Sequence, residues 1–255
     1  MTDDIVMDHL PTRRDEEWRY GALDTLKGMS KDTFENWRDI DVPVGESMCE
    51  TFVLDAADGA DLTRLRVNIG EGATAAIFAV NTGAPYSRME VVVRCAKGAH
   101  FEFGGVTIGG GDATREFVTR IAHDEPDATS NQVVRAVHWG KAVGNFLDRI
   151  DVVKEAQKTD AAQDFKAILL EKGASANAKP QLEIYADDVK CAHGAAIGAL
   201  DQTAAFYMAA RGLPPELARK LQIRAFVADA FLALEDEARQ EELLEKALAV
   251  LDRKL

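Results

Sequence analysis

The feature that most constrains the fold is a series of short strand-like segments with no helix-like segment between them. Hydrophobic and polar residues alternate with period two in 62–69, 89–95, 100–103, 114–121, 132–139 and 181–186, which predicts β-strands. Residues 51–155 contain no stretch of helical hydrophobic spacing. A doubly wound α/β fold needs such a helix between parallel strands, so this fold is disfavoured. A sandwich, a barrel and a β-helix remain open, since no repeat of fixed period is visible.

Glycine usage separates this middle region from the two ends of the chain. Residues 51–195 contain 14 of the 19 glycines, and residues 196–255 contain two. The run GGVTIGGG (104–111) predicts a glycine-rich turn between strands. We therefore expect a short N-terminal segment over 1–50, a β core over 51–195 and a helical region over 196–255.

The C-terminal region predicts three helices. Asp201 is a suitable N-cap for a helix to about Arg211, and Pro214 with Pro215 opens a second helix. The third helix carries leucines at 244, 248 and 251. The second helix has an apolar stripe at 217, 221, 225, 228 and 232. This stripe is expected either to pack on the chain's own β core or to dock another subunit.

Charge and composition exclude several classes of protein. The chain has 43 acidic and 30 basic residues and a net charge of −13, which argues against binding to nucleic acid or to an anionic membrane. No apolar run approaches the roughly 18 residues of a membrane span. Acidic residues lie where a signal peptide would be basic and then apolar, so a cytoplasmic protein is expected. Three cysteines are too few for a disulfide framework.

Sequence signatures of common enzymes are missing. The chain has no GxxxxGK[ST] phosphate-binding loop, no GxGxxG between a strand and a helix, no GxSxG and no HExxH. His123 precedes a proline turn and is expected to be structural, and His100 and His138 are expected to face solvent.

One local group of residues could carry chemistry. In YADDVKCAHG (185–194), Cys191 and His193 are two residues apart, so both side chains lie on one face of a regular strand. A thiolate and an imidazole so placed could bind iron, zinc or copper, with further ligands from elsewhere. The alternative is a buried Cys191 that packs as a small apolar side chain and a hydrogen-bonded His193. Asp187 and Asp188 could act as general acid and base, although adjacent residues of a strand point to opposite faces.

The chain contains two long characteristic blocks, LPTRRDEEWRYGALDTL (10–26) and PQLEIYADDVKCAHGAAIGALDQTAAFYMAARGLP (180–214). Both blocks resemble the SufB/SufD family, the scaffold proteins of the SUF iron–sulfur cluster assembly system, and within it the SufD members. The segments 123–142 and 152–170 between them also fit, so the resemblance extends from about residue 10 to the end of the chain.

The resemblance implies a fold and a non-catalytic function. The fold is a right-handed parallel β-helix followed by a C-terminal helical segment. The protein is a scaffold subunit that pairs with a SufB-like subunit and binds the ATPase SufC. His193 would lie at an interface for a cluster or iron, together with Cys191. An iron–sulfur cluster or iron would be held transiently in the complex, with none bound tightly by this chain alone.

The same resemblance locates the ATPase contact on the C-terminal helices. We expect Leu217 and Leu221 to contact SufC, with Arg211 and Arg224 adding polar contacts. Two alternatives remain open: a stand-alone structural homodimer with an inert Cys191 and His193, and a carbohydrate-acting β-helix protein.

Overall fold

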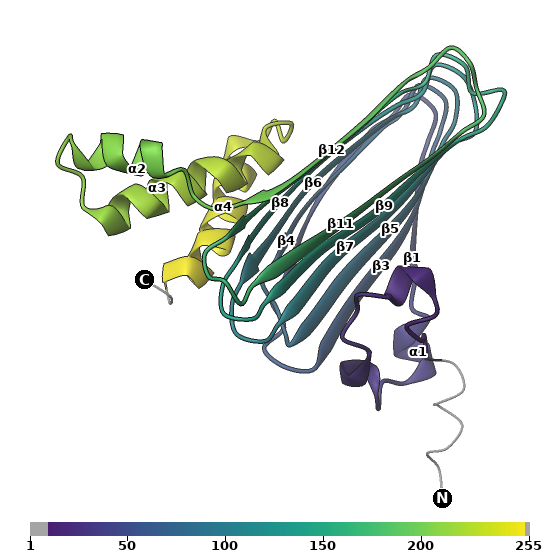
Figure 1. The fold of residues 1–255 in the computed structure, drawn as a ribbon. Helices are drawn as coiled ribbons and strands as arrows, with labels where there is room; N and C mark the ends of the chain where they lie inside the picture. Colours follow the sequence, from purple (N-terminus) through teal and green to yellow (C-terminus); the bar gives the residue numbers. More distant parts are fainter. Residues whose placement is uncertain (1–9, 253–255) are drawn as a thin grey trace, which may run out of the picture.

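A computed structural model describes residues 10–252, and twelve β-strands within that range form two parallel sheets (Figure 1). The odd-numbered sheet contains β1 (Arg38–Val42), β3 (Ala60–Ile69), β5 (Tyr86–Cys95), β7 (Thr114–His123), β9 (Val143–Val152) and β11 (Ser175–Ile184). The even-numbered sheet contains β2 (Ser47–Leu54), β4 (Thr74–Asn81), β6 (His100–Gly109), β8 (Thr129–His138), β10 (Asp160–Leu169) and β12 (Lys190–Gly198). The chain alternates between the sheets, so each pair of strands forms one coil of a solenoid. The expected parallel β-helix is confirmed.

The coils differ in length, which explains why the sequence shows no fixed repeat. Residues paired between neighbouring coils are 26 positions apart from β3 to β5 and 32 positions apart from β9 to β11. The strands stay in register, and the turns absorb the difference. A coil that returns to its own sheet replaces the crossover helix of an α/β protein.

The interior of the solenoid explains the alternating hydrophobic pattern. Alternate side chains of every strand point into the space between the two sheets. Buried phenylalanines from both sheets form the centre of this core: Phe101, Phe103, Phe117, Phe146 and Phe165. Phe103 and Phe117 meet edge to face, and Phe146 and Phe165 stack at 5.9 Å between ring centroids.

The glycine-rich run at 104–111 is a strand rather than the expected turn over most of its length. Gly104, Gly105 and Gly109 lie in β6, and only the last two glycines of the run lie in the turn that follows. A Cβ at Gly104 would lie 2.0 Å from the carbonyl oxygen of Ala230, and one at Gly105 would lie 2.8 Å from the ring of Phe117. These glycines therefore let the C-terminal region and the core approach the strand closely.

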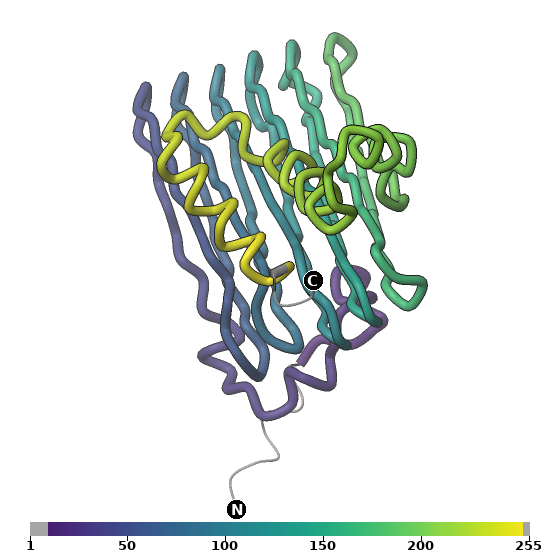
Figure 2. Tube along the Cα trace, turned by 90° about the vertical axis from the view of Figure 1, so that its left-hand side faces the viewer, coloured from purple at the N-terminus to yellow at the C-terminus, as the bar shows by residue number. Residues whose placement is uncertain are grey.

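The C-terminal region covers the outer face of the even-numbered sheet (Figures 1 and 2). It contains α2 (Gln202–Ala209), α3 (Pro215–Ala228), the short η4 (Asp229–Phe231) and α4 (Glu237–Asp252). Apolar residues of α3, η4 and α4 form one buried cluster with outward-facing residues of the sheet: Phe78, Val80, Val106, Ile108, Val137, Ile223, Val227, Phe231, Leu244 and Leu251. Arg135 of β8 pairs with Asp164 of β10 and with Asp229, which ties η4 to the sheet.

The N-terminal segment covers part of the outer face of the odd-numbered sheet. It contains η2 (Glu16–Trp18), η3 (Leu23–Leu26) and α1 (Lys31–Phe34). The buried Trp18 ring lies 3.9 Å from the guanidinium carbon of Arg88, which also donates to Glu116 and to the Glu17 carbonyl oxygen. The block DEEWRY thus encloses a buried ion pair on the outside of the solenoid.

Candidate functional site

The last coil of the solenoid has one uncovered edge in each sheet. Within residues 10–252, β11 pairs only with β9, and β12 pairs only with β10 (Figure 1). The Lys190 N–H donates to the carbonyl oxygen of Thr159 next to β10. Since backbone donors alternate along a strand, the N–H groups of Cys191, His193 and Ala195 face away from β10. A free edge of this kind can accept a further strand.

Cys191 and His193 both lie on β12, on the row of side chains that faces the interior. Cys191 is opposite Ala161 of β10, and His193 is opposite Gln163. Cys191 is partly buried and packs with Val189 against a small apolar cluster. His193 is exposed because no further coil covers it in the described chain. The tertiary structure therefore places His193 at the open end of the solenoid interior.

This pair supplies two donors and no complete metal centre. Burial raises the pKa of the Cys191 thiol, which therefore stays protonated at neutral pH unless a metal or a base removes the proton. Among residues 10–252, no three His, Cys, Asp or Glu side chains are grouped so that they could hold a metal ion. Two donors are fewer than a closed metal site requires, so a metal at this position would need ligands beyond Cys191 and His193.

A polar group lies deeper in the interior below His193. Asp148 of β9 accepts a hydrogen bond from the hydroxyl of Thr119, its neighbour on β7 of the same sheet, and another from the Gln132 amide across the space between the sheets, both at 2.8 Å. Burial raises the pKa of Asp148 to about 7, although these two hydrogen bonds oppose the shift. Sequence inspection did not single out Asp148 or Gln132, because a lone polar residue in an alternating strand normally faces solvent.

Asp148→Asn is expected to remove a pH dependence of stability. In the unfolded chain Asp148 loses its proton near pH 4, whereas in the folded protein it keeps the proton up to about pH 7. Unfolding between these two pH values therefore releases a proton, so the stability of the folded protein falls as the pH rises through this window. At pH 8 the neutral variant should be more stable than the wild type by up to about 4 kcal/mol, at 1.36 kcal/mol per pKa unit. Urea unfolding from pH 4 to pH 8 measures the difference. A difference that stays constant over this range contradicts the expectation.

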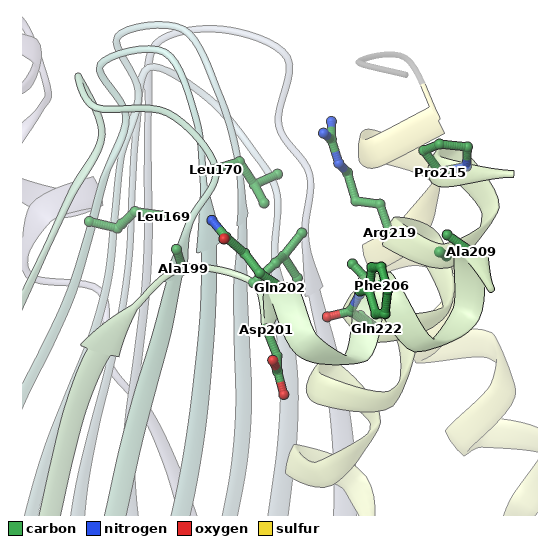
Figure 3. A pocket seen from close by; sticks show the side chains of 13 residues that line it. Leu169, Leu170, Ala199, Asp201, Gln202, Phe206, Ala209, Pro215, Arg219 and Gln222 are labelled. Carbon is green, nitrogen blue, oxygen red and sulfur yellow. The ribbon is translucent and has the colours of Figure 1, made fainter. Parts of the chain in front are cut away.

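A second candidate region is the apolar surface formed by α2 and α3. We define the α2–α3 patch as Phe206, Tyr207, Leu217 and Leu221, which are 77%, 57%, 45% and 41% exposed. The helix α2 buries none of its residues, although most of them are apolar. A pocket of about 470 Å³ lies between these helices and the turn after β10, with Phe206, Arg219 and Gln222 in its wall (Figure 3). Such an exposed apolar region is typical of a protein–protein contact.

The apolar stripe of α3 does not pack on the β core as a whole. Ala218, Ile223 and Val227 form the buried face of α3, whereas Leu217 and Leu221 are exposed. The interpretation of the stripe as core packing is therefore wrong for these two leucines. The exposed Phe206 and Tyr207 were missed, although a short apolar helix without an amphipathic pattern is a usable signal.

The two arginines of this region differ in their surroundings. Arg211 follows α2 and stacks on Tyr207, with its guanidinium carbon 3.5 Å from the ring centroid. Arg224 forms an ion pair of 2.6 Å with Glu241 of α4. Arg211 therefore adds a positive charge to the patch, and Arg224 holds α3 against α4.

The remaining candidates differ in their burial and contacts. Asp187 and Asp188 lie in the turn between β11 and β12, and Asp188 pairs with Lys158. The expectation that His138 faces solvent is wrong. It is fully buried, it bonds to Thr107, and desolvation lowers its pKa to about 3. His100 is partly buried and bonds to Thr129.

His123 lies buried at the end of β7 and bonds to Ser130 at 3.0 Å. Burial lowers the pKa of His123 to about 4, so its ring is neutral at physiological pH.

No helix in the described part of the chain is long and apolar enough to cross a membrane.

Comparison with known proteins gives a family match over most of the chain. Residues 50–226 match the family model described as SUF system FeS cluster assembly, SufBD core domain. The matched range contains β3–β12, α2 and most of α3, and therefore includes both candidate regions.

Individual relatives carry the same family name. The iron–sulfur cluster assembly protein SufD of Escherichia coli (strain K12) is 37% identical over 126 residues, 49% of this chain and 30% of that protein. A SufBD family protein of Synechocystis is 30% identical over 193 residues, 74% of this chain and 43% of that protein. The SufD of Bacillus subtilis (strain 168) is 28% identical over 160 residues, 57% of this chain and 36% of that protein. The matches thus span less than half the length of these relatives. Because the family model covers more than half of the chain, this chain belongs to the SufBD core family and is SufD-like.

Proposed function

We propose that the chain is a non-catalytic scaffold subunit of a SUF iron–sulfur cluster assembly complex. The observation that carries the proposal is the uncovered last coil, in which a free strand edge and the exposed His193 lie on the same strand, β12. The family match and the relatives named SufD support the same system.

The free edge suits a partner that also ends in a parallel sheet. In the described chain, β11 and β12 present unpaired backbone groups side by side at one end of the solenoid. A SufB-like subunit with an open coil of its own would extend both sheets and cover the interior. Pairing along strands aligns the partners to within one residue, because a slip of one position reverses every side chain.

In such a pair, His193 and Cys191 face the junction between the subunits. They supply one imidazole nitrogen and one sulfur, which suit iron and iron–sulfur units. The cargo would remain transient because, between residues 10 and 252, no three His, Cys, Asp or Glu side chains are grouped to hold it. The partner would supply the remaining ligands.

The α2–α3 patch is the proposed contact for the ATPase subunit SufC. It combines four exposed apolar or aromatic side chains with Arg211 at its border. Aromatic residues and arginine are enriched at the centres of protein interfaces. Since α3 also packs on the even-numbered sheet, a movement of the helices on ATP binding would be transmitted to the solenoid.

Ala195→Pro tests the pairing at the open end. The Ala195 N–H faces away from β10, so proline removes a donor for the partner strand while it spares the hydrogen bonds to β10. After co-expression with SufB and SufC of the host, the Ala195→Pro variant should no longer co-purify with SufB. The control Ala195→Ser keeps the backbone N–H and should still co-purify with SufB. Full recovery of SufB with a folded Ala195→Pro chain would contradict the proposal.

His193→Ala tests the cargo role separately. The complex should still assemble, because the exposed ring of His193 contributes no backbone pairing, but reconstituted cluster content should fall at least about tenfold if a ligand is lost. Iron and sulfide analysis of the purified complex measures this loss. An unchanged cluster content with an intact complex would reduce the chain to a structural subunit.

The same free edge favours a homodimer as a second candidate. Two copies can pair β11 and β12 through a two-fold axis when no SufB-like subunit is present. Light scattering of the purified chain should then give the mass of a dimer for the wild type and that of a monomer for Ala195→Pro.

A further inference from the structure

A row of hydrogen-bonded side chains crosses the outer face of the odd-numbered sheet and ends at the free edge of β11. One oxygen of the buried Glu116 carboxylate on β7 accepts from the Tyr86 hydroxyl and from Arg88. The other oxygen accepts from the Asn145 amide of β9 at 2.6 Å. Asn177 of β11 donates to the side-chain oxygen of Asn145 at 2.8 Å. The three strands hold these side chains in register, and we call Glu116, Asn145 and Asn177 the outer ladder.

The inner end of the outer ladder fixes the direction of both amides. A carboxylate that holds three donors can only accept, so Asn145 turns its nitrogen to Glu116 and its oxygen to β11. Asn177 presents its nitrogen to that oxygen. The side-chain oxygen of Asn177 is therefore left on the side of the free edge. Asn177 is partly exposed, and in the described part of the chain its side chain makes no other hydrogen bond.

The backbone of this edge is interrupted at Pro180. The N–H groups of Ser175 and Tyr185 donate toward β9, so the residues at even positions of β11 turn their N–H groups to the free edge. Pro180 occupies an even position and has no N–H. Backbone pairing alone therefore defines the register of an added strand less well on β11 than on β12, which contains no proline. A side-chain bond beside this gap would fix the register.

We propose that the Asn177 oxygen accepts a hydrogen bond from a side-chain amide, that of an asparagine or glutamine, on the strand that a SufB-like subunit adds to β11. Rows of such amides stabilise stacked strands through hydrogen bonds of this kind. An added strand lies about 4.8 Å away, the same spacing across which Asn145 and Asn177 already bond. The inference rests on the proposed function. It adds the residue that sets the register and the side chain that the partner carries.

A second copy of the chain is a poorer partner at this position. Two copies related by a two-fold axis at Asn177 would turn two side-chain oxygens toward each other, because each nitrogen is bonded to its own Asn145. Two acceptors that face each other in a covered interface both remain unpaired, which is costly. The acceptor end of the outer ladder therefore favours a partner of different sequence that presents a donor.

Three single variants separate the outward bond of Asn177 from its bond to Asn145. Asn177→Leu keeps the branched shape of the side chain but removes both the outward acceptor and the donor to Asn145. Asn177→Asp also loses that donor but keeps an oxygen that can accept. Gln181→Leu is the matched control, because Gln181 lies on the same strand and the same face, is also partly exposed and is not part of the outer ladder.

Each purified variant is titrated with SufB of the host, and circular dichroism verifies its fold. Asn177→Leu should weaken binding about tenfold, because the donor of the partner is left unpaired. Asn177→Asp and Gln181→Leu should stay within about threefold of the wild type. Unchanged binding of Asn177→Leu overturns the inference. An equal loss in Asn177→Asp overturns it too, because the effect then belongs to the bond with Asn145. If Asn177→Leu does not fold, Asn177→Ala is titrated in its place, with the same expected loss.

The outcome is distinguishable from a failure of the proposed function. A wild-type chain that does not bind SufB would reject the proposed function and this inference with it. Binding of SufB by the wild type, with no weakening in Asn177→Leu, would retain the scaffold role and reject the contact at Asn177. Light scattering of the chain alone covers the remaining case. Loss of a dimer in Asn177→Leu together with unchanged SufB binding would identify a second copy as the partner and overturn the assignment to SufB.

Discussion

Replacing Leu217 and Leu221 together with aspartate is expected to abolish co-purification of the SufC ATPase, with a loss of affinity of at least about 1000-fold. Both side chains are exposed on α3 and are spaced one helical turn apart, so both lie on the same face of this helix. The double variant removes two apolar side chains and would place two carboxylates in the proposed SufC interface, where desolvation is costly.

The fold should tolerate this change, because the buried face of α3 consists of other residues, among them Ile223 and Val227. Val44→Asp is the matched control. Val44 is 71% exposed and lies in the turn between β1 and β2, in the first coil rather than beside α2 and α3. Pull-down with tagged SufC should recover the wild type and the control but not the double variant. Recovery of the double variant in normal amounts would move the ATPase contact away from the α2–α3 patch.

Phe231→Ala is expected to lower the free energy of unfolding by about 3–5 kcal/mol. Phe231 is fully buried between the C-terminal region and the even-numbered sheet, and its ring meets Phe78 at 6.5 Å between centroids. The cavity left by the ring cannot be filled easily, because Gly104 brings the Ala230 carbonyl directly against the strand.

Phe206→Ala is the control for the same substitution on the surface. Phe206 is 77% exposed, so its removal should change the stability by less than about 0.5 kcal/mol. Urea unfolding followed by circular dichroism gives both values. Equal stabilities of the two variants would mean that the helices do not pack on the sheet as described.

The local pattern of the sequence determined the elements of this protein. Period-two alternation located six of the twelve strands, β3, β5, β6, β7, β8 and β11, because a strand that buries one face must alternate. Asp201 and Pro215 located the starts of α2 and α3, because capping and the missing proline N–H act within one helical turn. The motif around Cys191 and His193 indicated a shared strand face, which depends only on two residues of spacing.

The tertiary structure alone decided which faces are covered. On α3, Leu217 and Ile223 are both apolar. Ile223 is buried because it packs against the sheet, and Leu217 is exposed because it does not. Gly104 has no room for a side chain because Ala230, far along the chain, approaches the strand at this point. Gln163 lies beneath His193 only because coils of unequal length stack in register. These outcomes depend on contacts between residues distant in sequence, and neither periodicity nor local propensity contains them.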